Sequence, residues 1–114
     1  FVDARGLLTP QQLKLLTDRS QCFVGSDSGP FQCAAASNTH IVALLTHLLP
    51  DRILPYRHGV MGWNCTPILS DVSCVGCNDK QQRPVRQIVC EPGDYRCNKS
   101  FSSDRIANVI LELL

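Results

Sequence analysis

Two groups of residues in this sequence have the types and spacing that chemistry requires. The first is a polar turn, Gly-Ser-Asp-Ser-Gly-Pro at residues 25–30, between an apolar segment and an alanine-rich one. The second is a set of four spaced cysteines: Cys74, Cys77, Cys90 and Cys97. The turn has the residue types that bind a phosphorylated ligand, and the cysteines have those that hold a metal ion.

The polar turn is expected at the carboxyl end of a strand, just before a helix. In open α/β sheets this edge binds ligands, and the free N–H groups of a first helical turn attract anions. Gly29 lets a phosphate approach the backbone, and Ser28 can donate a hydroxyl. Asp27 would repel a phosphate, so it is better suited to accept hydrogen bonds from sugar hydroxyls. The alternative is that Asp27 or Ser28 only caps the helix.

The cysteine spacing predicts a four-thiolate metal site. The C-x2-C pair of Cys74 and Cys77 brings two thiolates onto one ion, and Cys90 and Cys97 can complete a tetrahedron. Two disulfides or free thiols are the alternatives. Seven cysteines form an odd number, which fits a complete disulfide framework poorly and favours thiolates kept reduced for a metal. Cys65 is a weaker candidate for a ligand.

The apolar pattern around the polar turn predicts a βαβ unit. Apolar runs at residues 21–25 and 40–45 are typical of buried strands, and residues 30–38 between them are expected to form a helix. This order implies a parallel sheet with a right-handed crossover. Upstream, residues 1–8 are expected to be the end of a strand and a turn, followed by a helix with Thr9 as its N-cap.

The segment after the second strand predicts less regular structure. It begins as a Pro-rich basic loop, in which His47, Arg52, Arg57 and His58 are expected at the same sheet edge as Asp27, where they could meet phosphates. Solvation of this loop is the alternative. Downstream, residues 86–89 are expected to form a short strand. An amphipathic helix capped by Ser102 or Ser103 is expected to pack on the sheet.

Composition limits the classes of function. The chain has 114 residues, of which 44% are hydrophobic and 18% charged, as in one globular domain. A net charge of +1 gives no reason to expect a nucleic acid as partner, and no apolar run is long enough to span a bilayer. Phe1 opens what looks like the interior of a domain, so we expect a fragment without a signal peptide, from which an N-terminal domain is missing.

The motif D-[ST]-G-P-x-x-x-A-A-A, at residues 27–36 between the two apolar runs, resembles the C-terminal half of glycosyltransferase family 9, the ADP-heptose heptosyltransferases. Leu13 and Leu16 after Gly6, and the Pro-Asp-Arg to Pro-Tyr-Arg stretch at 50–57, match that family in order. The resemblance implies two Rossmann-like domains that face a cleft. The C-terminal one binds the nucleotide sugar.

Site residues also follow from this resemblance. It implies that Asp27 faces the donor sugar and that Ser28 and Gly29 meet the pyrophosphate. Gln32 stands where the family usually has a histidine, and glutamine cannot carry a positive charge. The family's acceptor-activating base belongs to the N-terminal domain, so this chain alone should bind without catalysing. A catalytically inactive, metal-stabilised interaction domain with the same fold is the alternative.

The cysteine segment resembles the insert of bacterial autotransporter heptosyltransferases, whose four cysteines hold iron. Cys-x-x-Cys-Asn and the later Tyr-Arg-Cys-Asn-Lys-Ser carry this resemblance. It implies that Cys74, Cys77, Cys90 and Cys97 are the ligands of a structural zinc or iron ion. The role is structural because the protein fills all four positions.

These observations combine into one expectation. The fold class is α/β, with a Rossmann-like parallel sheet and a cysteine-rich metal-binding insert. Residues 1–62 form the nucleotide-sugar-binding part, 63–100 the insert and 101–114 the helix that packs on the sheet. The expected function is transfer of a sugar, a heptose, from a nucleotide diphosphate sugar to a glycan or protein acceptor. The expected location is the cytoplasm, with the inner face of the membrane as an alternative.

Overall fold

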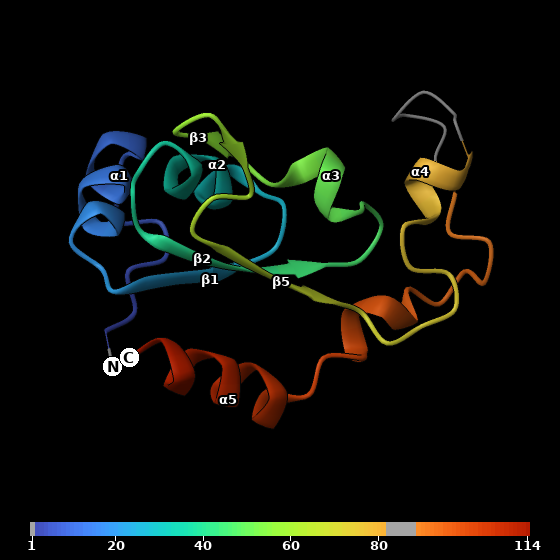
Figure 1. Cartoon of the computed structure of the whole chain (residues 1–114). Coiled ribbons are helices and arrows are strands. Elements are labelled where there is room, and N and C mark those ends of the chain that lie inside the picture. The colour runs from blue at the N-terminus through green and yellow to red at the C-terminus, as the bar shows by residue number, and fades with distance from the viewer. Residues whose placement is uncertain (1, 82–88) are drawn as a thin grey trace.

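A three-stranded parallel sheet is the centre of the computed structural model, which describes residues 2–81 and 89–114 (Figure 1). Its strands are β1 (Cys22–Gly25), β2 (His40–Leu45) and β5 (Cys65–Leu69), in the order β1-β2-β5. Helix α2 (Gly29–Ala35) connects β1 to β2, and these strands pair in parallel. The predicted α/β class, βαβ unit and parallel sheet are therefore confirmed.

The core lies between α2 and the upper face of the sheet. Phe31 and Ala34 of α2 are fully buried against three residues of β2: Ile41, Ala43 and Leu45. Successive side chains alternate between the faces of a strand, so Val42, which is also fully buried, points to the other face. The continuous apolar run of β2 follows from its central position, because a central parallel strand is covered on both faces.

Helix α1 (Pro10–Asp18) begins as predicted. The Thr9 hydroxyl accepts a hydrogen bond from the Gln12 N–H at 3.3 Å, and the Gln12 side chain accepts one from the Thr9 N–H at 2.8 Å. Residues 5–7 form the expected turn, but residues 2–8 contain no strand, so the expected strand end is wrong for them. Asp3 accepts hydrogen bonds from the backbone and the guanidinium of Arg5, so local side-chain bonding replaces strand pairing there.

Strand β5 was not expected from the sequence, and it lies in the range assigned to the insert. Pro67 in its middle argues against a strand, because proline cannot donate to a sheet ladder. Among the described strands β5 lies at the edge of the sheet, with a neighbour on one side only, and there proline is tolerated. The sheet therefore extends beyond the expected boundary at residue 62.

Several short elements follow β2 where a loop was expected. They are helix α3 (Pro50–Ile53), the hairpin of β3 (Tyr56–Arg57) and β4 (Val60–Met61), helix α4 (Cys77–Gln81) and the 3-10 helix η2 (Arg96–Lys99). The hairpin closes through His58 and Gly59, whose φ angles of 50° and 78° suit a two-residue turn. The strand expected over residues 86–89 falls, apart from Val89, outside the described residues.

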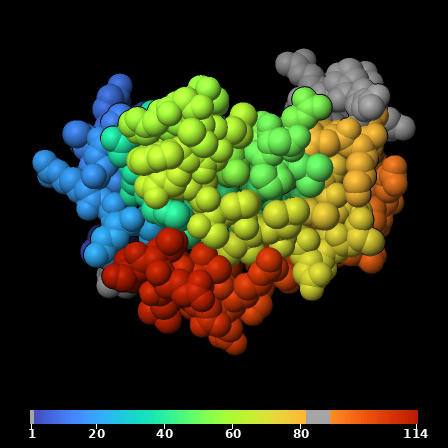
Figure 2. Space-filling view, in the orientation of Figure 1, coloured from blue at the N-terminus to red at the C-terminus, as the bar shows by residue number. Residues whose placement is uncertain are grey.

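Helix α5 (Ser103–Leu113) lies along the lower face of the sheet (Figures 1 and 2). The Ser102 hydroxyl caps it by accepting the Arg105 N–H at 3.4 Å. The structure describes every residue of α5, and none of them is buried, so its packing is looser than expected. Among the described residues, no helix is both long and apolar enough to cross a membrane.

A buried arginine joins the hairpin to the βαβ unit. Arg57 in β3 is 7% exposed. Its guanidinium donates to the carbonyl oxygens of Ala34 at 2.7 Å, Ala35 at 3.0 Å and Thr39 at 3.0 Å. It thereby brings a charged donor to the C-terminus of α2, where the helix dipole favours a cation. The Ala34 carbonyl also accepts from the N–H and the hydroxyl of Ser37.

Arg57 and His58 lie at the opposite end of the sheet from Asp27. Arg57 bonds Thr39, which precedes β2, and His58 Nε2 lies 3.1 Å from the Asn38 side-chain oxygen. The expectation that both residues meet phosphates beside Asp27 is therefore wrong. The chain returns from the carboxyl end of β2 to the amino ends of the strands through α3 and residues 54–55, before the hairpin begins.

We expect Arg57→Ala to lower the free energy of unfolding by about 3 kcal/mol, because the buried Arg57 side chain and its three hydrogen bonds to backbone carbonyls are lost. Urea unfolding followed by circular dichroism measures this. Arg52→Ala is the control, since Arg52 is 67% exposed and pairs with Asp79 only at 3.7 Å. It should change stability by less than about 0.5 kcal/mol. Equal effects of the two variants would contradict the assigned role of Arg57.

Candidate functional site

A cavity of about 200 Å³ lies at the carboxyl ends of β1 and β2, and we call it the Asp27 pocket. Its wall consists of Ser26, Asp27, Leu44, Leu45, Thr46, His47, Leu48 and Asn98. The carboxyl ends of parallel strands lie on the same edge of the sheet. The two residues after β1 and the two residues after β2 therefore lie close together. Asn98 comes from η2, far along the chain. Asp27 and His47 are thus where the sequence predicted them.

Neither Asp27 nor Ser28 caps α2 through its side chain. Ser28 occupies the N-cap position without a side-chain capping bond, and its hydroxyl donates to the Ser26 carbonyl at 3.0 Å. The Asp27 carboxylate accepts from the Gln32 side-chain amide at 3.3 Å, its one hydrogen bond to a described residue. The capping alternative therefore does not account for these residues.

The four predicted donor-binding residues do not all reach the pocket. Asp27 lines it, whereas Ser28, Gly29 and Gln32 are exposed and are not part of its wall. Gln32 orients the Asp27 carboxylate instead. A Cβ at Gly29 would meet no described atom within 4 Å, so packing does not require glycine there.

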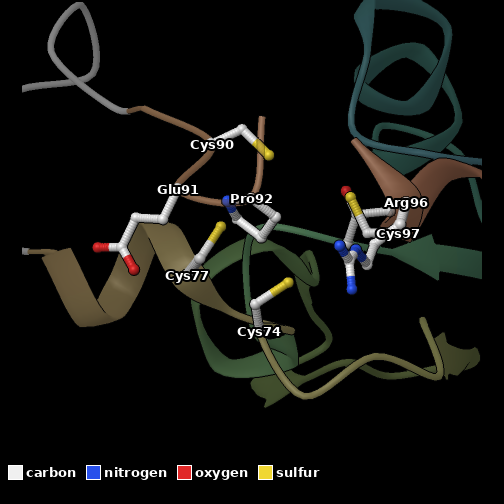
Figure 3. Close-up of a pocket in the computed structure, with 8 residues that line it drawn as sticks. Cys74, Cys77, Cys90, Glu91, Pro92, Arg96 and Cys97 are labelled. Carbon is white, nitrogen blue, oxygen red and sulfur yellow. The ribbon is translucent and has the colours of Figure 1, made fainter. Parts of the chain in front are cut away.

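A second cavity, of about 110 Å³, is lined by all four predicted ligand cysteines, and we call it the cysteine cavity. Figure 3 shows Cys74, Cys77, Cys90 and Cys97 around it, together with Glu91, Pro92 and Arg96. Cys74 precedes α4 and Cys77 is its first residue. Cys90 lies in the irregular segment before η2, and Cys97 lies in η2. The structure thus gathers the four residues from separate segments.

The four thiols share the cavity without forming a metal-ligand arrangement. All seven cysteines lie within the described residues and are free, so the disulfide alternative receives no support. Within residues 2–81 and 89–114, no group of three or more His, Cys, Asp or Glu is arranged to hold a metal. As a donor set the four thiolates fit zinc or iron, and binding an ion would require the sulfur atoms to move together.

Burial raises the pKa of the Cys77 thiol, and the neighbouring Cys74, Cys97 and Cys90 raise it further. Each of these thiolates would repel a negative charge on Cys77. A bound cation reverses this effect because metal binding deprotonates thiols. The electrostatic coupling supports the geometric observation that the four cysteines belong to one cluster.

Three hydrogen bonds attach the first half of the cysteine segment to the loop after β2. They run from Gly76 N–H to Thr46 O at 2.9 Å, from Asn78 N–H to His47 O at 3.0 Å, and from Leu49 N–H to Asp79 Oδ2 at 2.9 Å. Gly76 is buried and has a φ of 71°, and Leu49 occupies the space that a Cβ at this position would need. The loop between β2 and α3 therefore contacts the Asp27 pocket on one side and the cysteine cavity on the other.

The second half of the cysteine segment is attached to the end of β5. Ser70, which is 4% exposed, donates from its hydroxyl to the Cys97 carbonyl at 3.1 Å. The Ser70 hydroxyl also lies 2.6 Å from the Ser100 hydroxyl, which accepts the Asp71 N–H at 3.2 Å. These contacts hold η2 beside the sheet.

The remaining cysteines lie away from the cysteine cavity. Cys22 in β1 and Cys33 in α2 are half-buried, where burial was expected. Cys65 in β5 packs against the core and donates from its sulfur to the Trp63 carbonyl at 3.4 Å. Burial raises the pKa of the Cys65 thiol. Cys65 is therefore a structural residue and not a fifth member of the cluster.

The structure adds Thr46 and Asn98 to the site. Thr46 lines both the Asp27 pocket and the cysteine cavity, and Asn98 lines the Asp27 pocket. In the sequence, Asn98 stands out only as part of an Asn-Lys-Ser triplet directly after Cys97. Its position next to a predicted metal ligand was the one local signal that could have drawn attention to it.

No protein-family model, no curated protein and no solved structure matches this chain. The resemblance to glycosyltransferase family 9 therefore stays an expectation drawn from the two motifs. The Asp27 pocket and the cysteine cavity are properties of the structure and do not depend on it.

We expect Gly76→Ala to expose the cysteine cluster, because a Cβ there would approach Leu49 Cδ2 at 2.7 Å. The rate of Cys modification by a thiol reagent in the folded protein should rise severalfold. Gly93→Ala is the matched control. Its φ of 73° imposes similar backbone strain, about 1 kcal/mol, but no described atom lies within 4 Å of the added Cβ. If both variants react alike, attachment through Gly76 is not what protects the thiols.

Proposed function

We propose that this chain is the donor-binding domain of a glycosyltransferase and binds a nucleotide diphosphate sugar, such as ADP-heptose, at the Asp27 pocket. The observation that carries the proposal is the Asp27 carboxylate itself. It does not cap α2, it accepts one hydrogen bond from a described residue, and it lines a cavity at the carboxyl edge of a parallel sheet. This edge is where α/β sheets of the Rossmann type bind their ligands.

The size of the pocket suits one part of such a ligand. Complete small-molecule sites occupy roughly 300–1,000 Å³, and the Asp27 pocket has about 200 Å³. We therefore place the sugar in the pocket, with its hydroxyls donating to Asp27. The phosphates would lie towards Ser28, Gly29 and His47, and the nucleotide on the surface beyond. Acceptor activation would come from a further domain, so the chain would bind donor without transferring its sugar to a glycan or protein acceptor.

A second candidate function is a metal-stabilised interaction domain without activity. Gln32 favours it, because this side chain bonds Asp27 and brings no positive charge to the donor phosphates. The two candidates differ in affinity for nucleotide sugars. They share the metal site.

We also propose that Cys74, Cys77, Cys90 and Cys97 hold one zinc or iron ion. Their shared cavity and the mutual effect on the pKa of Cys77 support this. The ion would have a structural role, since four thiolates leave no open position for a substrate. It would stabilise a segment that has few buried apolar side chains, and binding would contribute directly to folding.

Asp27→Asn should weaken binding of ADP-heptose about tenfold, because an amide replaces a charged acceptor of sugar hydroxyls. Isothermal titration calorimetry on the metal-containing protein measures this. Gly29→Ala should fold normally and also bind more weakly, since the added methyl group occupies space open to a phosphate. Asp18→Asn is the control, because Asp18 lines a cavity at the amino ends of β1 and β2, opposite the Asp27 pocket. A wild-type chain that binds neither ADP-heptose nor UDP-glucose would overturn the donor-binding proposal in favour of the interaction domain.

Elemental analysis of protein purified without chelator should find about one zinc or iron per chain. Cys77→Ser should lose the metal and melt at a lower temperature. Cys33→Ser should keep it, because Cys33 is a half-buried cysteine of α2 outside the cluster. Wild-type protein that is folded and metal-free would overturn the proposed metal site.

A further inference from the structure

We infer that Asn98 is a ligand-binding residue of the Asp27 pocket and that the cysteine cluster positions it. This inference rests on the proposed function and adds to it a residue and a coupling between the two sites. Asn98 belongs to the cysteine segment and lines the Asp27 pocket. Binding of the sugar donor is therefore coupled to whether the four thiols hold a metal ion.

The two sites are connected by a third cavity, of about 160 Å³. It shares Thr46, His47 and Asn98 with the Asp27 pocket. With the cysteine cavity it shares Thr46 and three cysteines: Cys77, Cys90 and Cys97. The Asp27 pocket and the cysteine cavity are therefore neighbours, and Asn98 is the residue of the cysteine segment that lines both the Asp27 pocket and the connecting cavity.

The Asn98 side chain is available to a ligand. It is exposed, and it makes no hydrogen bond to any other described residue. Its amide offers both donors and an acceptor, whereas the Asp27 carboxylate only accepts. One sugar hydroxyl can thus donate to Asp27 and accept from Asn98. The hydroxyl then acts as both a hydrogen-bond donor and a hydrogen-bond acceptor. A pocket with this pair of side chains suits a polyhydroxylated ligand better than a bare phosphate.

The backbone under Asn98 depends on its anchors. η2 has four residues and is preceded by Tyr95 with a left-handed φ of 51°. So short a 3-10 helix is not stable by itself. It is held by the bond from Ser70 to the Cys97 carbonyl and by the Cys97 side chain in the cysteine cavity. An ion bound to the Cys97 sulfur would restrict the adjacent residue, Asn98, and so preorganise the pocket.

Calorimetry with ADP-heptose on metal-containing Asn98→Ala tests the binding role. We expect affinity to fall about 5–10-fold, the effect of one lost hydrogen bond. Melting temperature and metal content should not change, because the side chain has no partner among the described residues. Asn108→Ala in α5 is the control and should bind as the wild type does.

A double-mutant cycle with Cys97→Ser tests the positioning role. Cys97→Ser alone should weaken binding, and adding Asn98→Ala to it should weaken binding by less than about twofold more. If Cys97→Ser does not fold, Cys74→Ser replaces it in the cycle. Additive losses would overturn the positioning role.

The outcomes separate this inference from the proposed function. If wild-type protein binds ADP-heptose and Asp27→Asn binds more weakly while Asn98→Ala is unchanged, the inference fails and the proposed function stands. If the wild-type protein binds no nucleotide sugar, both fail.

Discussion

The arrangement of this protein depends on one buried guanidinium. Arg57 donates to three carbonyl oxygens, two at the end of α2 and one just before β2. The two ends of the connection between α2 and β2 are thereby held in a fixed relation. Because Arg57 belongs to the β3–β4 hairpin, the same contact directs the chain to β5. The central strand β2 and the residues that follow it are positioned as a consequence.

The loop after β2 contacts both proposed sites. Thr46 and His47 line the Asp27 pocket, and their carbonyl oxygens accept hydrogen bonds from the cysteine segment. The proposed donor site and the proposed metal site are therefore neighbours that share a wall. A metal that orders the cysteine segment would act on ligand binding through backbone contacts. A structural ion, if held by the four cysteines as proposed, would thereby influence a site whose ligand it does not touch.

Local features were predicted well where a few neighbouring residues contain the whole signal. The capping box of Thr9 and Gln12, the N-cap Ser102 and the βαβ unit all follow from short-range patterns, and the structure confirms them. Strand β5 was missed because Pro67 contradicts the usual strand pattern, and only its edge position makes the residue acceptable. Arg57 and His58 were expected at the wrong edge because the chain returns to the amino ends of the strands between β2 and β3, through α3 and residues 54–55.

The sequence by itself determined the kinds of chemistry that this protein can offer: a carboxylate in a strand-to-helix turn, and four thiols in one segment. Residue type and spacing along the chain are sufficient for both. Only the tertiary structure decided that Asn98 joins Asp27 and His47 in one pocket, and that Arg57 serves the core instead of a ligand. Those relations are set by contacts between segments 20 to 70 residues apart, and local propensity contains no information about which distant segments pack together.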